Sequence, residues 1–249
     1  MSNIAAVIGG KAKGKADQVT IDPALGCKNK CVGCYAKKSC QRGKHYDDVV
    51  YKNLDKKVLK KSIRLVKSKG FQLARVGKHC DPGERLDDLN GILDCCNDER
   101  FRCIVVSKSL VWTRTIANSL RSGNHILHIS LGPYTDVAPN EWFRIKTAEA
   151  YRDSGVKTVI RLTRDVTEYP SELDTYIMSF WKDRYIITPM RYPSWDIANF
   201  YKAKKENFDF VSGYYRPIKV HPVWEQYMTN VCGEIDNKIR CCNCLEHVV

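Results

Sequence analysis

Short apolar runs alternate with longer amphipathic segments along most of the chain. The short runs are rich in β-branched and aromatic residues, which is typical of buried strands, and the longer segments repeat their apolar positions with the period of a helix. The six predicted strands are 18–22, 71–76, 102–107, 125–131, 157–162 and 185–189. Predicted helices fill the gaps between them, for example 55–68, 85–96, 140–154 and 171–181.

Six strand-then-helix units in succession imply a parallel sheet with right-handed crossovers. A cysteine-rich loop follows the first strand in place of a glycine-rich phosphate fingerprint. The pattern therefore favours an α/β fold with a partial (β/α)6 parallel barrel over a dinucleotide-binding sheet, and residues that follow the strands are the candidates for chemistry. Because the pattern ends at Pro222, we expect a flexible basic arm at 1–17, the barrel at 18–222 and a short metal-binding tail at 223–249.

Composition narrows the setting in which this fold works. The opening apolar run is too short for a signal peptide, and no stretch approaches the roughly 18 apolar residues of a membrane span. We therefore expect a cytoplasmic protein without a membrane partner, in which the 12 cysteines favour metal binding over a disulfide framework. The formal charge of +13 favours nucleic acid, nucleotides or other anionic partners, with a solvated basic surface as the alternative.

Three cysteines lie directly after the first predicted strand. Cys27, Cys31 and Cys34 have the spacing Cys-x3-Cys-x2-Cys. Three thiolates can hold three irons of a 4Fe-4S cluster and leave the fourth iron open to a small molecule. A structural zinc site is the alternative, and it would need a fourth ligand such as Cys40 or His45.

This motif, which is followed by Tyr35, resembles the signature of the radical S-adenosylmethionine (radical SAM) superfamily. With the segments 21–23, 106–109 and 128–131, it makes residues 18 to 165 similar to the spore photoproduct lyase-like branch. The resemblance implies a radical SAM type of barrel, with S-adenosylmethionine (SAM) bound to the open iron. It also implies an electron donor such as flavodoxin or ferredoxin, and a 5'-deoxyadenosyl radical that abstracts hydrogen from substrate.

The resemblance also implies roles for individual residues. The Tyr35 backbone would lie near the adenine, Lys108 would neutralise the methionine carboxylate, and Ser130 would serve polar groups of the cofactor. Cys80 is the candidate for the hydrogen-donating cysteine that spore photoproduct lyase keeps in this general region, although its spacing does not clearly match. The residues by themselves leave alternatives open, because a lysine after a strand can extend to solvent and a strand serine can bond the backbone.

Other polar residues follow or interrupt the predicted strands. Asp81 and Glu84 could accept hydrogen bonds from the ribose or the methionine amine, and in the alternative reading they form a turn and open a helix. Arg161 is a charge inside an apolar strand, where it needs a partner such as a carboxylate or a phosphate. We expect Arg161 to bind the cofactor, and Arg75 and Lys78 are further candidates for phosphate contacts.

The remaining cysteines divide into two groups. Cys95, Cys96 and Cys103 fall on predicted core positions, so we expect inert buried thiols. The tail is too short to build a core, and a metal would have to supply its folding energy. The predicted ligands are Cys232, Cys241 and Cys244, with Cys242 or His247 as the fourth, and either zinc or an auxiliary iron-sulfur cluster fits them.

The sequence thus predicts a radical SAM enzyme, of lyase or transferase type, that abstracts hydrogen from an unidentified substrate, with a nucleic acid or nucleotide favoured. A DNA base would have to leave the stack, and Trp195, Tyr214 or Tyr215 could receive it unless these residues pack in the core. The cysteine-rich tail argues against simple repair of a DNA photoproduct. The alternatives are a radical SAM enzyme with an auxiliary cluster that modifies a protein or small metabolite, and a non-catalytic nucleic-acid-binding zinc protein.

Overall fold

The computed structural model divides the chain into two compact units. The first contains Met1–Lys30, Ala36–Ile129 and Asp136–Thr158, and the second contains Cys31–Tyr35, Ser130–Thr135 and Val159–Val249. The structure describes residues 2–8, 19–32, 34, 48–132, 139–181, 184–190, 195–211 and 214–226. The predictions that lie outside the described residues concern Tyr35, Cys40, His45, Cys232, Cys241, Cys242, Cys244 and His247. The division into arm, barrel and tail also stays a prediction.

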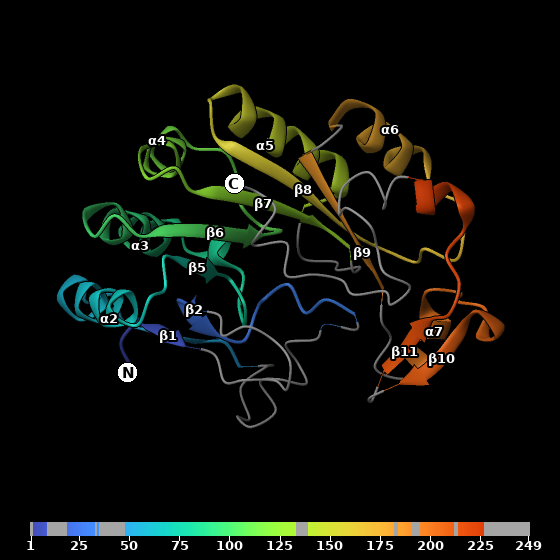
Figure 1. The fold of residues 1–249 in the computed structure, drawn as a ribbon, viewed down its shortest axis with the longest axis horizontal. Helices are drawn as coiled ribbons and strands as arrows, with labels where there is room; N and C mark the ends of the chain where they lie inside the picture. The colour runs from blue at the N-terminus through green and yellow to red at the C-terminus, as the bar shows by residue number, and fades with distance from the viewer. Residues whose placement is uncertain are drawn as a thin grey trace. The chain divides into compact units, whose positions relative to one another are not determined.

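A mostly parallel sheet forms the centre of the first unit, in the strand order β1-β2-β5-β6-β7 (Figure 1). Its strands are β1 (Ala6–Ile8), β2 (Val19–Ile21), β5 (Leu73–Val76), β6 (Arg102–Ser107) and β7 (Ile126–Leu131). Only β1 is antiparallel to its neighbour. Every residue of β7 is buried, which is typical of a strand covered on both faces. A separate two-stranded sheet, β3 (Ala24–Leu25) with β4 (Val50–Tyr51), lies near the end of β2 in the sequence.

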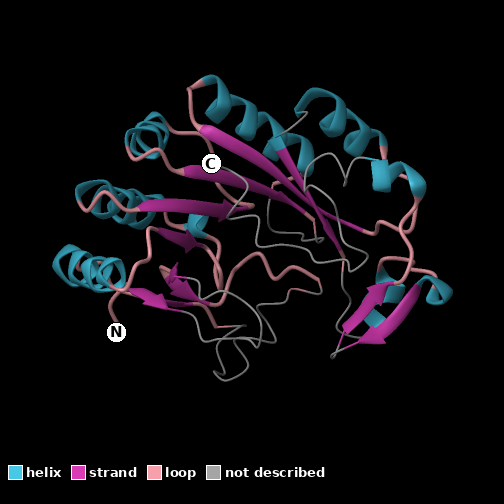
Figure 2. Ribbon diagram, viewed as in Figure 1, coloured by secondary structure: helices cyan, strands magenta, loops and turns pink. Residues whose placement is uncertain are grey.

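Helices of the first unit follow the strands in alternation along the chain, and Figure 2 distinguishes the helices from the strands by colour. They are α2 (Lys56–Ser68), α3 (Leu86–Asp98), α4 (Arg114–Ser122) and α5 (Glu141–Asp153), with a 3-10 turn η2 (Pro82–Glu84) after β5. Side chains that accept hydrogen bonds from free backbone N–H groups cap three of the four helices, namely Asp55 on α2, Thr113 on α4 and Asn140 on α5. These caps help to fix where the three helices begin.

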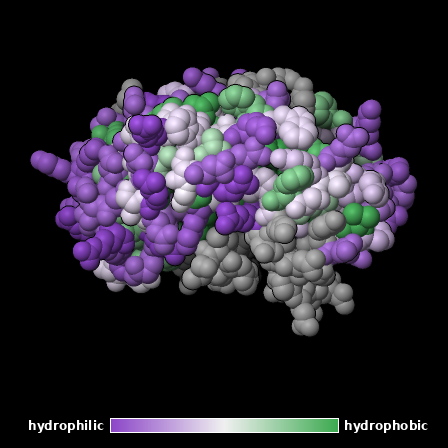
Figure 3. Space-filling view, turned by 90° about the horizontal axis from the view of Figure 1, so that it is seen from above, coloured by the Kyte–Doolittle hydropathy of each residue, from purple (hydrophilic) through white to green (hydrophobic). Residues whose placement is uncertain are grey.

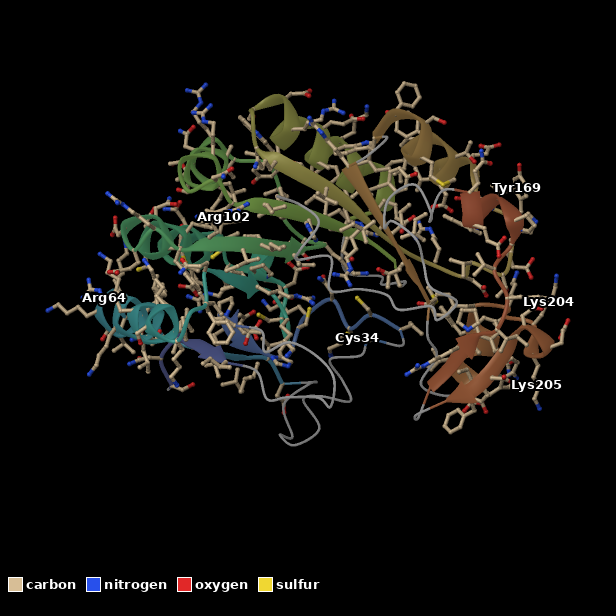
Figure 4. The ribbon with its side chains drawn as sticks, viewed as in Figure 1. Cys34, Arg64, Arg102, Tyr169, Lys204 and Lys205 are labelled. Atoms are coloured by element: carbon tan, nitrogen blue, oxygen red, sulfur yellow. The ribbon has the colours of Figure 1, made fainter. Side chains whose placement is uncertain are left out.

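A row of ion pairs connects α2 with α3. Lys60 Nζ lies 2.6 Å from Asp98 Oδ2, and Arg64, labelled in Figure 4, lies 2.6 Å from Glu99 Oε1. The row continues with Lys56 and Asp94 at 3.4 Å. Basic residues four apart on α2 therefore pair with acidic residues on α3 and at its C-cap. Exposed pairs of this kind contribute little stability, but they offset the positive charge of α2.

The second unit contains the last two parallel strands and a smaller β-hairpin. Its elements are most of β8 (Lys157–Arg164), α6 (Glu172–Trp181), β9 (Tyr185–Pro189), α7 (Trp195–Phe200), η4 (Lys205–Asn207), β10 (Phe208–Val211) and β11 (Tyr214–Pro217). β8 pairs with β9 in parallel, and β10 pairs with β11 in antiparallel. Trp195 and Tyr215 pack against a small core that contains Met190 and Phe208, as in the core-packing alternative for these aromatic residues.

Each of the six predicted strands is present, as β2, β5, β6, β7, β8 and β9. The four helix ranges given from the pattern correspond to α2, α3, α5 and α6. The predicted α/β class with a mostly parallel sheet is therefore confirmed, whereas the hairpin was not predicted. Within the described residues, no helix has the length and apolar character that crossing a membrane requires. On the face drawn in Figure 3, hydrophilic residues predominate and hydrophobic ones are scattered.

Candidate functional site

The cysteine loop (residues 26–30) leaves the β3 strand on a left-handed turn. Gly26 has φ 87°, a conformation that favours glycine, and the N–H of Lys30 donates to the carbonyl of Cys27. Cys27, Cys31 and Cys34 are half-buried and form no disulfide, and Cys34 is labelled in Figure 4.

In the part of the chain that the structure describes, no group of three or more His, Cys, Asp and Glu side chains is placed to hold a metal ion. Metal sites of flexible loops commonly close only when the metal binds, because its binding energy offsets the repulsion and ordering of the thiolates. The ligand role of Cys27, Cys31 and Cys34 therefore stays a prediction from their spacing.

Asp81, in the loop after β5, is a buried carboxylate that accepts five hydrogen bonds. Its Oδ2 accepts from Asn29 Nδ2 at 2.8 Å and from the backbone N–H groups of Lys108 at 2.7 Å and Ser109 at 3.2 Å. Its Oδ1 accepts from the N–H of Gly83 at 2.9 Å and from the Ser107 hydroxyl. We call these six residues the Asp81 network. It joins the cysteine loop, the loop after β5 and the end of β6.

Glu84 forms a second connection to the cysteine loop. Its Oε1 accepts from the Lys28 N–H at 2.8 Å and from Cys27 Sγ at 3.4 Å, and its Oε2 lies 3.4 Å from the Tyr51 hydroxyl. The Tyr51 ring also lies 4.9 Å from the guanidinium of Arg85, within the range of a cation–π contact. Glu84 thus touches the first predicted cluster ligand.

Asp22 follows β2 and connects that strand with the loop after β5. Its buried carboxylate accepts from the N–H groups of Lys78 at 2.7 Å and His79 at 3.1 Å, and its Oδ2 lies 3.0 Å from His79 Nδ1. Cys80 Sγ lies 3.8 Å from Oδ1 of the same carboxylate. The candidate hydrogen donor Cys80 is therefore a buried thiol beside a carboxylate.

Two glycines allow these loops to approach one another. A Cβ at Gly77, where φ is 88°, would lie 2.5 Å from the Val106 carbonyl oxygen and 2.7 Å from Pro82 Cδ. A Cβ at Gly83 would lie 2.6 Å from the Ser107 Oγ. Real Cβ contacts are almost never so short, so the loop after β5 reaches the end of β6 only because both positions lack a side chain.

The carboxylates set the electrostatics of the site. Burial raises the pKa of the Cys27 thiol, and the negative charges of Asp81 and Glu84 raise it further. Burial also raises the pKa of Cys80, with Asp22 adding to it, and burial raises the pKa of Glu84. Both thiols therefore stay protonated unless a cation offsets these charges. A bound metal ion would supply this positive charge and would favour the deprotonated thiolate of a cysteine that binds it.

Burial and hydrogen bonding act in opposite directions on Asp22. Burial tends to raise the pKa of its carboxyl group, but the hydrogen bonds and charge of His79, with the Lys78 N–H, outweigh burial and leave the pKa below its usual value. Asp22 is therefore ionised at neutral pH. Its charge in turn favours the protonated thiol of Cys80.

The structure brings some of the predicted residues together. Cys27 and Glu84 are in contact, and Asp81 binds the backbone of Lys108, whose side chain is half-buried. In the second unit, Ser130 is buried and its Oγ donates to the Gly132 carbonyl at 3.5 Å, as the alternative of a backbone-bonded serine anticipates. Arg161 lies half-buried within β8. Cys95, Cys96 and Cys103 are buried, as expected.

Sequence reasoning assigned no role to several residues that build the site. Asn29 lies inside the cysteine motif, Asp22 lies in segment 21–23, and Ser107 and Ser109 flank Lys108. All of them are part of the segments that carried the family resemblance. Their position in those motifs was a usable signal, but their contacts depend on residues far away in the chain.

Comparison with known proteins supports the fold. No family model matches the sequence, and no curated protein matches it. Among solved structures, a spore photoproduct lyase mutant with bound AdoMet and dinucleoside spore photoproduct aligns with a TM-score of 0.62 at 12% identity, over 84% of this chain and 72% of that chain. A spore photoproduct lyase complexed with the dinucleoside alone gives 0.60 at 13%, with the same coverage.

A second protein shares the fold over a smaller part of its length. The structure of Streptococcus suis SuiB bound to S-adenosylmethionine aligns with a TM-score of 0.52 at 16% identity, over 68% of this chain and 38% of that chain. Identities this low show the fold alone. The predicted resemblance to the spore photoproduct lyase-like branch is thereby confirmed at the level of the fold.

Proposed function

We propose that this chain is a radical SAM enzyme that binds a 4Fe-4S cluster through Cys27, Cys31 and Cys34. When bound, the cluster supplies the electron that cleaves S-adenosylmethionine to a 5'-deoxyadenosyl radical, which abstracts hydrogen from the substrate. One observation carries the proposal. The loop with the first cysteine is bonded by Asp81 and Glu84 to the ends of parallel strands, in a fold shared with structures that contain AdoMet.

The chain's own residues fit such a cluster. Three half-buried cysteines without disulfides lie within eight residues and match the donor set that iron-sulfur clusters use. The raised pKa of Cys27 favours the protonated thiol, so iron would have to displace this proton when the cluster binds. We propose a low-potential protein such as flavodoxin or ferredoxin as the electron donor.

Residues around the strand ends would bind SAM. Lys108 would pair with the methionine carboxylate, Ser130 and the Tyr35 backbone would contact polar groups and the adenine, and Arg161 would bind a further anionic or polar group. Glu84 would accept a hydrogen bond from the methionine amine, because within the described residues its Oε2 accepts only the long bond from Tyr51. The roles of Lys108, Ser130 and Tyr35 follow from the family resemblance, and those of Arg161 and Glu84 from their charge and place in the sequence.

Cys80 is proposed as the hydrogen donor to the substrate radical. A thiol donates a hydrogen atom only while it is protonated. Burial and the charge of Asp22 raise the pKa of Cys80, so the protonated form persists at neutral pH. The environment of Cys80 therefore suits the donor role.

For the substrate, we propose a nucleic acid or nucleotide first and a peptide second. A dinucleoside is bound in the spore photoproduct lyase structures that share this fold. A precursor peptide is bound in a SuiB structure that aligns at a TM-score of 0.53. The second metal, zinc or an auxiliary iron-sulfur cluster at Cys232, Cys241, Cys242 and Cys244, remains part of the proposal and would favour the peptide or metabolite reaction if it were iron.

Anaerobic reconstitution with iron and sulfide, followed by dithionite and SAM, tests the function directly through the yield of 5'-deoxyadenosine. We expect product from the loaded protein, and loss of both product and most cluster iron in Cys31→Ala. Cys95→Ala is the matched control, because Cys95 is a fully buried thiol of α3 and should leave iron and product unchanged. A fully loaded wild type without product, or a colourless zinc protein that binds nucleic acid, would overturn the proposal.

A further inference from the structure

We infer that Asp81 is a positioning residue: its buried carboxylate holds the cysteine loop, through Asn29, in register with the segment that carries Lys108. The inference replaces the expected contact between Asp81 and the cofactor, and its catalytic meaning rests on the proposed function. The bracing, by which we mean that Asp81 holds the cysteine loop in place, rests only on contacts within the first unit.

The contacts form a closed triangle of three loops. Asn29 Nδ2 donates to Asp81 Oδ2 at 2.8 Å, and the Ser109 N–H donates to the same oxygen at 3.2 Å. Ser109 Oγ then donates to Asn29 Oδ1 at 2.8 Å. Each of the three residues therefore bonds both of the others, and none can shift without breaking two contacts.

Burial strengthens the hydrogen bonds of this triangle. Asn29 is 2% exposed and Asp81 is 7% exposed, so water competes weakly for their polar atoms. A buried polar group that loses its partner is costly, and the cost is larger for a charge. The network therefore favours one arrangement of the cysteine loop over the alternatives that flexible loops otherwise sample.

The hydrogen-bond count argues against a cofactor contact by Asp81. A carboxylate offers about four lone-pair sites, and Asp81 already accepts five hydrogen bonds from protein donors. A ribose hydroxyl or an ammonium group would have to displace one of these donors and leave it unsatisfied. Glu84, which is half-buried and has the long bond to Tyr51, is the better candidate for that contact.

The position of the network explains what it achieves. Asp81 accepts a hydrogen bond from Asn29, which lies two residues after Cys27, and another from the backbone N–H of Lys108. Groups that bind two parts of one cofactor must keep their separation to within about 0.5 Å. Asp81 thus couples the first cluster ligand to the cation proposed for the SAM carboxylate.

Hydrogen–deuterium exchange of the cluster-free protein tests the bracing. In Asp81→Asn, peptides covering 26–30 and 107–110 should both exchange about tenfold faster, since the amide nitrogen of Asn cannot accept the bonds of Asn29 and Lys108. Asn29→Ala should give the same pattern. The matched control is Asp55→Ala, which removes the N-cap of α2 and should loosen only the start of that helix. Faster exchange at 107–110 alone would overturn the inference.

The affinity of the reconstituted protein for SAM then tests the coupling. We expect Asp81→Asn and Asn29→Ala each to raise the dissociation constant roughly tenfold, with the double variant little worse than either single one, because both remove one shared network. Direct binding of SAM by Asp81 would instead leave Asn29→Ala near the wild type and would overturn the inference. If the wild-type protein binds no SAM, the proposed function fails, whereas the exchange result still decides the bracing.

Discussion

The carboxylate of Asp22 and the imidazole of His79 are bonded at 3.0 Å, with Asp22 4% exposed at its side chain. The same carboxylate accepts the backbone N–H groups of Lys78 and His79. A residue that follows β2 therefore determines the path of the loop after β5, which carries Cys80, Asp81 and Glu84. The sequence predicted no role for Asp22 and His79, but they support a loop whose residues have proposed roles.

Replacing Asp22 should destabilise the protein in a pH-dependent way. Its pKa is lower in the folded protein than the ordinary value of 3.8, so its contribution is full above that value and is lost as the pH falls through the folded pKa. We expect Asp22→Asn to lower the free energy of unfolding by about 1–3 kcal/mol at pH 7. Urea denaturation should show the gap to the wild type narrowing below about pH 3.8.

The control for this measurement is Asp153→Asn. Asp153 is exposed and bonds only its neighbour Arg152 among the described residues, so its replacement should change stability little. An Asp22→Asn gap that stays constant down to the lowest pH at which the protein folds would contradict the assignment.

His125 should make the protein sensitive to mild acid. Burial, with the nearby charge of Arg102, lowers the pKa of this imidazole to about 4, while its Nδ1 accepts the N–H of Cys103 at 3.0 Å. The unfolded chain binds the proton more tightly, so stability should fall by about 1.4 kcal/mol per pH unit between roughly pH 6.5 and 4. In His125→Gln this component of the slope should disappear. Equal slopes in the two proteins would show that His125 does not titrate in this way.

Gly77 and Gly70 form a matched pair for testing loop packing. Both have φ 88°, but a Cβ at Gly70 meets nothing within 4 Å, whereas one at Gly77 would overlap Val106 and Pro82. Gly70→Ala should cost about 1 kcal/mol for the backbone alone. Gly77→Ala should cost about 1–3 kcal/mol more for overpacking. Thermal or urea unfolding measures both, and equal costs would contradict the close approach of the two loops.

Charge on α3 should suppress nucleic-acid binding by α2. Replacing the acidic partners of the ion-pair row, in Asp94→Asn, Asp98→Asn and Glu99→Gln together, leaves Lys56, Lys60 and Arg64 without them. We expect roughly tenfold tighter binding of single-stranded DNA at about 50 mM salt and a steeper loss of affinity as salt rises. Fluorescence anisotropy measures both. An unchanged salt slope would show that α2 contacts no phosphate.

The strands and most helices followed from the sequence, because burial on a strand or on one helix face leaves a local periodicity in the residues. The cysteine motif likewise needs only spacing within eight residues. Even the positions of Asn29, Ser107 and Ser109 beside motif residues were visible in the sequence.

Tertiary structure alone decided what those residues touch. Asp81 meets Asn29 across 52 positions of sequence and Lys108 across 27, and no local pattern encodes a contact of that kind. The positioning role that we infer for Asp81 therefore rests on the fold, because only the fold shows how many donors already surround a carboxylate. The sequence likewise shows the basic residues of α2, but only the fold shows that Lys60 and Arg64 pair with Asp98 and Glu99.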